Sequence, residues 1–171
     1  MTGYVALLRA VNVGGRKLIM EDLKAIATKL GFAKVRTYIA SGNLLFSSNL
    51  GEGEVKAKLE ARLAEHMGAQ VPVMVRTASE LQRVVSGNPF TADPGNRVAA
   101  IFLDHAPPAG TAETARNVAD ERIALGEREV YVAYGEHGMG QSRLKIPAAK
   151  TGTARNMNTV AKLAEMAMEM S

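Results

Sequence analysis

The sequence predicts an α+β fold of two packed halves, each of the β-α-β-β-α-β type, with the second half incomplete or irregular. Short runs rich in β-branched residues alternate with amphipathic segments of helical period. The first half contains segments for all six elements of this order, and the second half contains segments for part of it. The chain has 171 residues, of which 47% are hydrophobic and 22% are charged, as in an ordinary globular protein. We place the boundary between the halves after residue 78, so that residues 79–171 form the second half and its last helix returns to the first.

The first half begins with an apolar run over residues 4–11, which is typical of a buried strand. Arg9 is the only charged residue in this run, and a buried charge needs a partner or a ligand. Residues 20–30 repeat apolar side chains at helical spacing and are followed by Gly31, which predicts a helix that ends there.

The remaining elements of the first half are two strands, a helix and a last strand. β-Branched and aromatic residues predict strands over 34–40 and 44–47, joined by the tight turn Ser41-Gly42-Asn43. Apolar residues spaced four apart predict a helix over 54–67, and an apolar run predicts a strand over 71–76. This order is that of a ferredoxin-like unit, in which strand one pairs with strand three. The loop after strand one then lies near the turn between strands two and three.

The second half has weaker patterns. The expected segments are a helix at about 79–86, a connector over 88–96, a strand at 98–103, a weak helix at 111–120, a hairpin of 123–125 with 130–134, a loose segment at 135–142 and a final helix at about 154–169. The resulting order is α-β-α-β-β-α, a partial echo of the first half.

Several classes of protein are excluded by composition. The chain has no cysteine, which excludes disulfide frameworks, thiolate nucleophiles, zinc ribbons and iron–sulfur clusters. No apolar run is long enough for a membrane span, and the N-terminus has no signal-peptide pattern, so we expect a cytoplasmic protein without membrane contact. The three histidines lack metal-ligand spacing, so no metal or cofactor is expected, and only His137, in a glycine-rich loop, is a candidate acid–base residue.

Charge is distributed unevenly along the chain. Residues 1–48 hold seven basic and two acidic side chains, residues 49–140 hold nine basic and thirteen acidic, and residues 141–171 hold five basic and two acidic. If the two basic ends meet in space, they form a positive site that suits an anion. The alternative is a solvated surface of mixed charge.

The first candidate group lies in the basic N-terminal region. Glycines that expose backbone N–H groups can form an anion-binding nest, and polar side chains can complete it. The alternative is that these segments are ordinary turns, which also favour Gly, Asn and Ser; for Arg9 the alternative is a salt bridge. The expected ligand-binding residues of this group are Arg9, Asn12, Gly14, Gly15, Lys17, Ser41, Gly42 and Asn43.

The second candidate group lies at the expected start of the final helix. A cation in the first turn opposes the helix dipole, so Arg155 and Lys150 would be poorly placed unless they hold an anion. We therefore expect Arg155→Ala to weaken ligand binding and to leave the fold intact or slightly more stable. The alternative is an exposed arginine that reaches water. The expected ligand-binding residues of this group are Lys150, Thr153, Arg155, Asn156, Asn158 and Thr159.

The two ends of the chain also resemble a known protein family. The resemblance is carried by Tyr4-Val-Ala-Leu-Leu-Arg9, Asn12-Val-Gly-Gly15, Thr37-Tyr-Ile39, Ser41-Gly-Asn43 and Thr153-Ala-Arg155-Asn156-Met-Asn158-Thr159-Val160. These segments are similar to the signatures of domain-of-unknown-function family 1697. The resemblance implies an α+β fold of two ferredoxin-like halves and assigns no biochemical function. The chain departs from the family pattern at Ala10, where glycine is usual, and at Met157, where an aromatic residue is usual.

Two classes of function compete at this point. The first is the binding of an anionic ligand, a nucleic acid or a nucleotide, in a basic cleft between the two halves. The second is an enzyme that acts on a small phosphorylated or carboxylated substrate held by the same residues, although no nucleophile or general base with a partner is visible. A protein-interaction module is a third reading, and the oligomeric state is left open.

Overall fold

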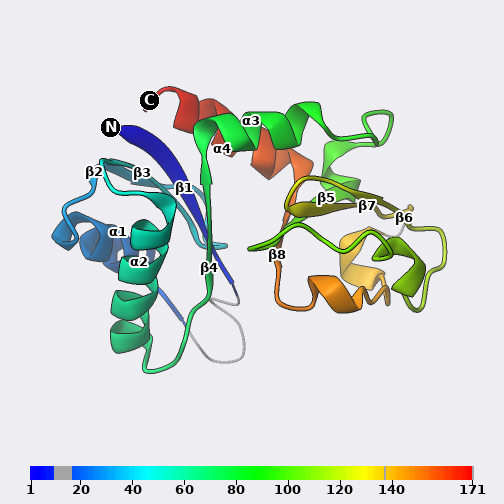
Figure 1. Cartoon of the computed structure of the whole chain (residues 1–171), viewed down its shortest axis with the longest axis horizontal. Coiled ribbons are helices and arrows are strands. Elements are labelled where there is room, and N and C mark those ends of the chain that lie inside the picture. Colours follow the sequence, from blue (N-terminus) through cyan, green and yellow to red (C-terminus); the bar gives the residue numbers. More distant parts are fainter. Residues whose placement is uncertain (10–16, 137, 171) are drawn as a thin grey trace. The chain divides into compact units, whose positions relative to one another are not determined.

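The computed structural model describes residues 1–9, 17–136 and 138–170 and contains two four-stranded antiparallel sheets in that part of the chain (Figure 1). The chain divides into two compact units. Unit 1 comprises Met1–Leu81 with Leu163–Ser171, and unit 2 comprises Gln82–Lys162. The chain passes from one unit to the other within α3 (Ala78–Ser86) and again within α4 (Met157–Met168).

Unit 1 has the expected β-α-β-β-α-β order and the expected pairing of strand one with strand three. Its sheet has the order β2-β3-β1-β4, and every neighbouring pair is antiparallel. The elements are β1 (Thr2–Leu8), α1 (Met20–Lys29), β2 (Ala33–Thr37), β3 (Asn43–Ser48), α2 (Glu52–Met67) and β4 (Val73–Thr77). The ferredoxin-like prediction is therefore confirmed for this unit.

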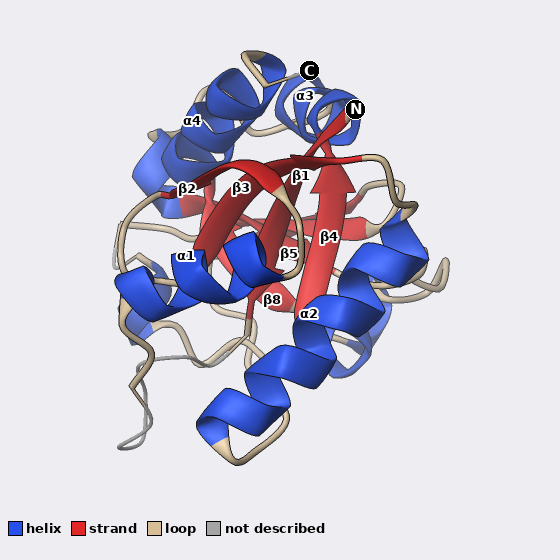
Figure 2. Ribbon diagram, turned by 90° about the vertical axis from the view of Figure 1, so that its left-hand side faces the viewer, coloured by secondary structure: helices blue, strands red, loops and turns tan. Residues whose placement is uncertain are grey.

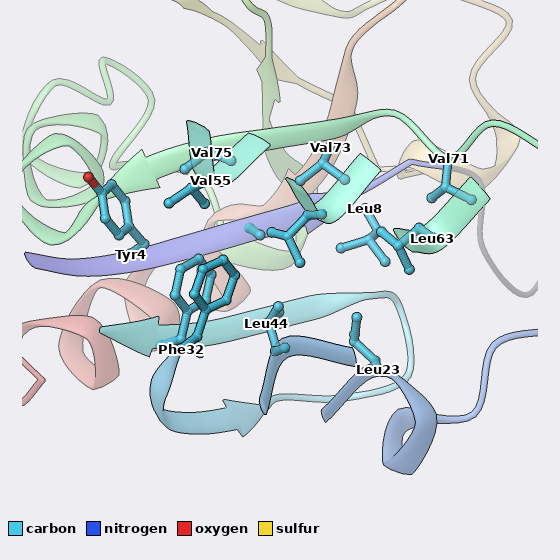
Figure 3. Close-up of a cluster of buried hydrophobic side chains, with 14 of the residues drawn as sticks. Tyr4, Leu8, Leu23, Phe32, Leu44, Val55, Leu63, Val71, Val73 and Val75 are labelled. Atoms are coloured by element: carbon cyan, nitrogen blue, oxygen red, sulfur yellow. The ribbon is translucent and has the colours of Figure 1, made fainter. Parts of the chain in front are cut away.

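One face of this sheet carries the hydrophobic core of unit 1, and α1 and α2 lie over it (Figure 2). Alternate residues of β1 point into the core, because successive side chains of a strand point to opposite faces. Tyr4, Ala6 and Leu8 are the core residues of β1, and Figure 3 shows Tyr4 and Leu8 in this core. The rings of Phe32 and Phe46 stack in the same core with centroids 4.3 Å apart.

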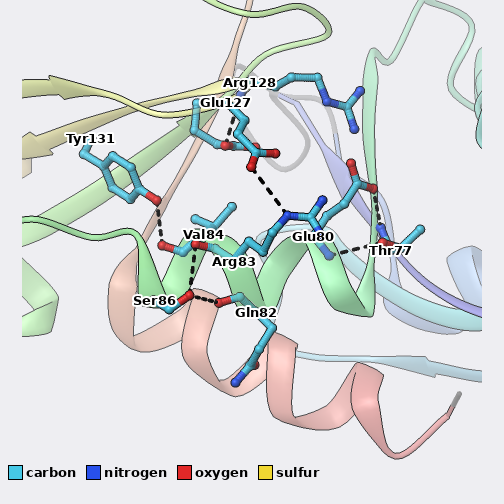
Figure 4. A network of polar contacts seen from close by, with 10 residues as sticks. Thr77, Glu80, Gln82, Arg83, Val84, Ser86, Glu127, Arg128 and Tyr131 are labelled. Carbon is cyan, nitrogen blue, oxygen red and sulfur yellow. Dashed lines mark hydrogen bonds and ion pairs between the residues drawn. The ribbon is translucent and has the colours of Figure 1, made fainter.

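The helix ends of unit 1 follow from the sequence. Gly31 and Gly68 have φ angles of +87° and +70°, a left-handed conformation that glycine adopts without steric cost. At the start of α3, the backbone N–H of Thr77 donates to the Glu80 carboxylate at 2.9 Å, and the backbone N–H of Glu80 donates to Thr77 Oγ1 at 3.2 Å (Figure 4). This reciprocal pair is a capping box, which satisfies two N–H groups that the helix leaves unbonded.

Unit 2 repeats the sheet order of unit 1 without its crossover helices. Its strands are β5 (Val98–Phe102), β6 (Arg122–Leu125), β7 (Glu129–Ala133) and β8 (Thr153–Asn156), in the order β6-β7-β5-β8. The connections between β5 and β6 and between β7 and β8 are irregular and contain only short 3-10 turns among the described residues, at Ala112–Thr114, Met139–Gln141 and Pro147–Ala149. The expected helix over 111–120 is therefore wrong. The α+β class and the irregular second half are confirmed.

The expected start of the final helix is also wrong. Residues 153–156 form β8, which pairs with β5 so that Arg155 lies opposite Ala100, and α4 begins only at Met157. Asn156 ends the strand and caps the helix, because its Oδ1 accepts the backbone N–H of Thr159 at 2.9 Å. A four-residue edge strand that runs directly into a helix is too short to show an alternating pattern, and its partner β5 is distant in the sequence.

Two side-chain contacts join α3 to β7 and to the turn before it. The Tyr131 hydroxyl on β7 donates to the Val84 carbonyl oxygen at 2.6 Å, and the Arg83 Nε lies 3.5 Å from the Glu127 carboxylate (Figure 4). The opposite face of the sheet carries a second, smaller core that includes Ala99, Val130 and Val132. Unit 2 therefore has apolar residues on both faces of its sheet.

Candidate functional site

The N-terminal candidate group lies around the end of β1. Arg9 follows the strand instead of lying inside it, because β1 ends at Leu8, so the expectation of a buried strand arginine is wrong at this position. Its backbone N–H donates to the Pro72 carbonyl oxygen at 3.0 Å. Lys17 is exposed. The remaining members of the expected nest, Asn12, Gly14 and Gly15, lie outside the described residues, as does His137.

The turn between β2 and β3 lies beside the end of β1, as the topology predicts. The backbone N–H of Leu8 donates to the Gly42 carbonyl oxygen at 2.9 Å, and Gly42 has a φ angle of +87°. The fully buried Asn43 donates through Nδ2 to the Tyr38 carbonyl oxygen and to Ser41 Oγ, both at 2.9 Å. The Asn43 amide therefore stabilises the turn from within, while Ser41 is exposed.

Arg155, in the C-terminal group, is a buried strand residue and not an exposed helical one. It is 8% exposed, and its Nη1 donates to Thr153 Oγ1 at 3.0 Å and to the Ala154 carbonyl oxygen at 2.9 Å. Burial lowers the pKa of the guanidinium to about 10. The dipole of α4 therefore does not oppose this cation as expected, because Arg155 lies in β8 and precedes the first turn of the helix.

The other polar residues of the C-terminal group have local structural contacts. Asn156 and Thr159 form the cap of α4. Asn158 is exposed and lies against Gly95, where a Cβ atom would stand 2.1 Å from the Asn158 Oδ1. The two groups belong to different units, with Arg9 and Asn43 in unit 1 and the residues from Lys150 to Thr159 in unit 2. Their joint role in one cleft stays a prediction.

A pocket of about 550 Å³ lies within unit 2, and we name it the basic pocket. Among the described residues, three cationic side chains line it: Arg116, Lys145 and Lys150. The other described lining residues are apolar or aromatic: Ile101, Tyr134, Leu144, Ile146, Pro147 and Ala149. A volume of this size is within the usual range of small-molecule sites.

Two of the three cations are held side by side by the backbone. The N–H of Arg116 donates to the Lys145 carbonyl oxygen at 2.8 Å, and the N–H of Lys145 donates to the Arg116 carbonyl oxygen at 2.9 Å, which forms an antiparallel bridge. Side chains that lie directly opposite each other in such a bridge are neighbours, with Cβ atoms about 5 Å apart, and like charges there are destabilising. An anion between the two cations would reverse the sign of this interaction.

Tyr134 lines the same pocket and carries a hydroxyl group. The residue is 8% exposed, and burial, followed by the charge of Glu121, raises the pKa of its hydroxyl. The hydroxyl is therefore protonated at neutral pH and is a hydrogen-bond donor. Over residues 1–9, 17–136 and 138–170 it makes no hydrogen bond to another protein group, although buried hydroxyls normally have a partner.

Arg155 faces away from the basic pocket. Arg155 pairs with Ala100, and the next residue of β5, Ile101, lines the pocket. Because adjacent residues of a strand point to opposite faces, the Arg155 side chain and the pocket lie on opposite sides of the sheet. Among the residues of the expected site that the structure describes, only Lys150 lines the basic pocket.

The periodicity of the sequence could not predict that Arg116 and Lys145 are neighbours in the structure. Arg116 lies in the segment expected to be a weak helix, and Lys145 follows a glycine-rich segment without periodicity. The available signal was the excess of basic residues over 141–171, which includes Lys145 and Lys150. Only the β-bridge between two irregular segments brings Arg116 to them.

The described part of the chain contains no group of three or more His, Asp or Glu side chains arranged to hold a metal ion. Among its helices, none combines the length and the apolar character that a membrane crossing needs.

Comparison with known proteins supports the fold and the family. The conserved bacterial protein SP0830 from Streptococcus pneumoniae has a similar structure, with a TM-score of 0.80 and 24% sequence identity over 98% of this chain and 99% of that one. At this identity the likeness shows the fold alone. A search of curated proteins finds no match. The family described as "Protein of unknown function (DUF1697)" matches residues 1–131, a span that ends before the Thr153–Val160 segment of the resemblance. The chain therefore belongs to the DUF1697 family.

Proposed function

We propose that this protein binds an anionic ligand, and that the basic pocket of unit 2 holds it. The observation that carries the proposal is the bridge that places Arg116 and Lys145 directly opposite each other at the pocket. Both side chains are exposed, so their charges act on the same stretch of the pocket surface. A bound anion would be attracted by both.

Lys150 adds a third cation to the pocket, and the Tyr134 hydroxyl adds a neutral donor. Cationic and hydroxyl donors in one concave site suit phosphate or carboxylate groups, whose oxygens accept several hydrogen bonds. The described lining contains no carboxylate that would compete with the ligand. The same features support a small anion, such as a nucleotide, over a long nucleic acid, because the pocket has the volume of a small-molecule site.

A titration of the protein with inorganic phosphate and pyrophosphate, followed by isothermal calorimetry, tests this proposal. We expect Lys145→Gln and Arg116→Gln to weaken binding about tenfold or more, which corresponds to the loss of one charge-assisted hydrogen bond. Lys58→Gln is the matched control, because Lys58 is an exposed lysine on α2 in unit 1. A control variant that weakens binding as much as Lys145→Gln, or a wild-type protein that binds neither anion, would contradict the proposal.

The dependence of binding on salt separates the two kinds of anion. A nucleic acid that contacts several phosphates loses affinity steeply as salt increases, because counterions are released on binding. A ligand confined to the basic pocket contacts three cations and should show a shallow dependence. We therefore expect the affinity for a mononucleotide to fall only slightly as salt increases. We do not expect single-stranded RNA to bind with a steep salt dependence that the Lys145→Gln change removes.

A further inference from the structure

We infer that the ligand of the basic pocket is an organic phosphate ester, whose apolar or aromatic group lies against the apolar wall while its phosphate lies at the three cations. This inference rests on the proposed function and goes beyond it by naming the chemical class of the ligand. It draws on three features of the pocket: its charge, its apolar wall and its buried hydroxyl.

The charge of the pocket favours a phosphate over a carboxylate. Arg116, Lys145 and Lys150 carry three positive charges when protonated. A phosphate monoester carries a charge of about −1.5 to −2 at neutral pH and has three acceptor oxygens, whereas a carboxylate carries a single charge. A phosphate can therefore engage all three cations, and a carboxylate would leave most of their mutual repulsion in place.

The apolar wall requires more than a phosphate. Ile101, Leu144 and Ile146 line the pocket and also belong to, or pack against, the smaller core of unit 2. The wall is therefore held in place by the same packing that holds the sheet, and it is largely pre-formed. A volume of about 550 Å³ is much larger than an inorganic phosphate needs, and the remaining space borders on apolar side chains.

Tyr134, which lines the pocket, carries a hydroxyl that can donate a hydrogen bond. The residue is 8% exposed, and its hydroxyl makes no hydrogen bond to the part of the chain that the structure describes. An ester or phosphate oxygen of the ligand can accept a hydrogen bond from this hydroxyl, which would give the donor a partner and orient the ligand. The pocket thus combines a cationic end, an apolar wall and a single orienting donor, as do sites for small amphipathic ligands.

Three probes test the inference, each titrated by calorimetry: phenyl phosphate has both a phosphate and a ring, inorganic phosphate lacks the ring, and benzoate has a carboxylate in place of the phosphate. We expect phenyl phosphate to bind at least tenfold more tightly than either of the others, because only phenyl phosphate uses both ends of the pocket. A tenfold difference is equivalent to about 1.4 kcal/mol.

Substitutions in the pocket test whether the tighter binding of phenyl phosphate arises there. We expect Leu144→Ala to weaken phenyl phosphate binding at least threefold while inorganic phosphate binding is unchanged, and we expect Lys145→Gln to weaken both. Leu125→Ala is the matched control, because Leu125 is a leucine of unit 2 that is 36% exposed and does not line the pocket. Tyr134→Phe keeps the ring in the core and removes only the hydroxyl, so it tests the donor even if Leu144→Ala fails to fold.

The outcomes separate the two proposals. If inorganic phosphate and phenyl phosphate bind equally and both depend on Lys145, the ligand class is wrong and the proposed anion site stands. If benzoate binds as tightly as phenyl phosphate, the preference for phosphate is overturned. If none of the three probes binds, both proposals are overturned. Equal effects of Leu144→Ala and Leu125→Ala on phenyl phosphate would overturn the role of the apolar wall.

Discussion

Gly152 lies where β8 approaches β5, and replacing it by alanine tests how closely the two strands are packed. A Cβ atom at this position would stand 2.7 Å from Ile101 Cγ2, 2.8 Å from Leu103 Cδ2 and 2.8 Å from the Phe102 carbonyl oxygen. The two side chains can rotate away to some extent. The carbonyl oxygen belongs to the backbone of β5 and can move only if the strand moves.

The expected cost of Gly152→Ala follows from these distances. An ordinary van der Waals contact begins at about 3.4 Å, so the new methyl group must displace a strand by several tenths of an ångström. Overpacking of this kind costs about 1–3 kcal/mol. In a chain of this size each kcal/mol lowers the melting temperature by about 2–4 °C, so we expect a decrease of about 2–12 °C.

Differential scanning calorimetry of Gly152→Ala beside Gly53→Ala measures this effect with a control of opposite sign. Gly53 lies in α2, and a Cβ atom there meets nothing within 4 Å. Alanine at that position should stabilise the helix by about 0.5–1 kcal/mol, because it restricts the unfolded chain. A Gly152→Ala protein that melts at or above the wild-type temperature would refute the close approach of β8 to β5.

Three further substitutions have defined outcomes. Arg155→Ala should lower the free energy of unfolding by about 2 kcal/mol or more in urea denaturation, because it removes two hydrogen bonds from a buried charged donor; an unchanged midpoint would contradict this. Tyr131→Phe should reduce the loss of stability between pH 10 and 12. Burial raises the folded-state pKa of Tyr131 to about 12. The protonated hydroxyl therefore contributes stability that is fully present below pH 10 and is lost as the pH rises through 12. Parallel curves of stability against pH for the two proteins would contradict this prediction. Thr77→Ala should cost about 0.5–2 kcal/mol, measured by thermal unfolding, because it removes half of the capping box with Glu80; a cost no larger than that of an exposed Thr28→Ala change on α1 would refute the cap.

The fold of unit 1 was accessible from the sequence because its signals are local. Apolar residues at helical spacing define α1 and α2, and Gly31 and Gly68 end them with the positive φ angles that glycine favours. The strand order followed from the order of the elements, since few topologies are compatible with it. The bond from the Leu8 N–H to the Gly42 carbonyl shows that the turn between β2 and β3 lies beside the end of β1.

The C-terminal part shows where local signals fail. Residues 153–156 lie beside a helical pattern, and their hydrogen-bond partners on β5 are about 50 residues earlier in the chain. The strand forms because those partners are available in the folded unit. The strand propensity of four residues alone does not predict this pairing. The same pairing buries Arg155, which the sequence alone had placed in an exposed helical turn.

The sequence by itself determined the α+β class, the ferredoxin-like order of unit 1 and the family to which the chain belongs. It also located the excess of positive charge in residues 141–171, and Lys150 of this region lines the basic pocket, while its binding role stays a prediction. Only the tertiary structure decided that Lys150 shares a pocket with Arg116 and Lys145, and that Arg155 faces the other side of the sheet. The physical reason is that periodicity reports which face of an element is apolar, whereas a bridge between two irregular segments depends on hydrogen bonds that form only after the sheet has assembled.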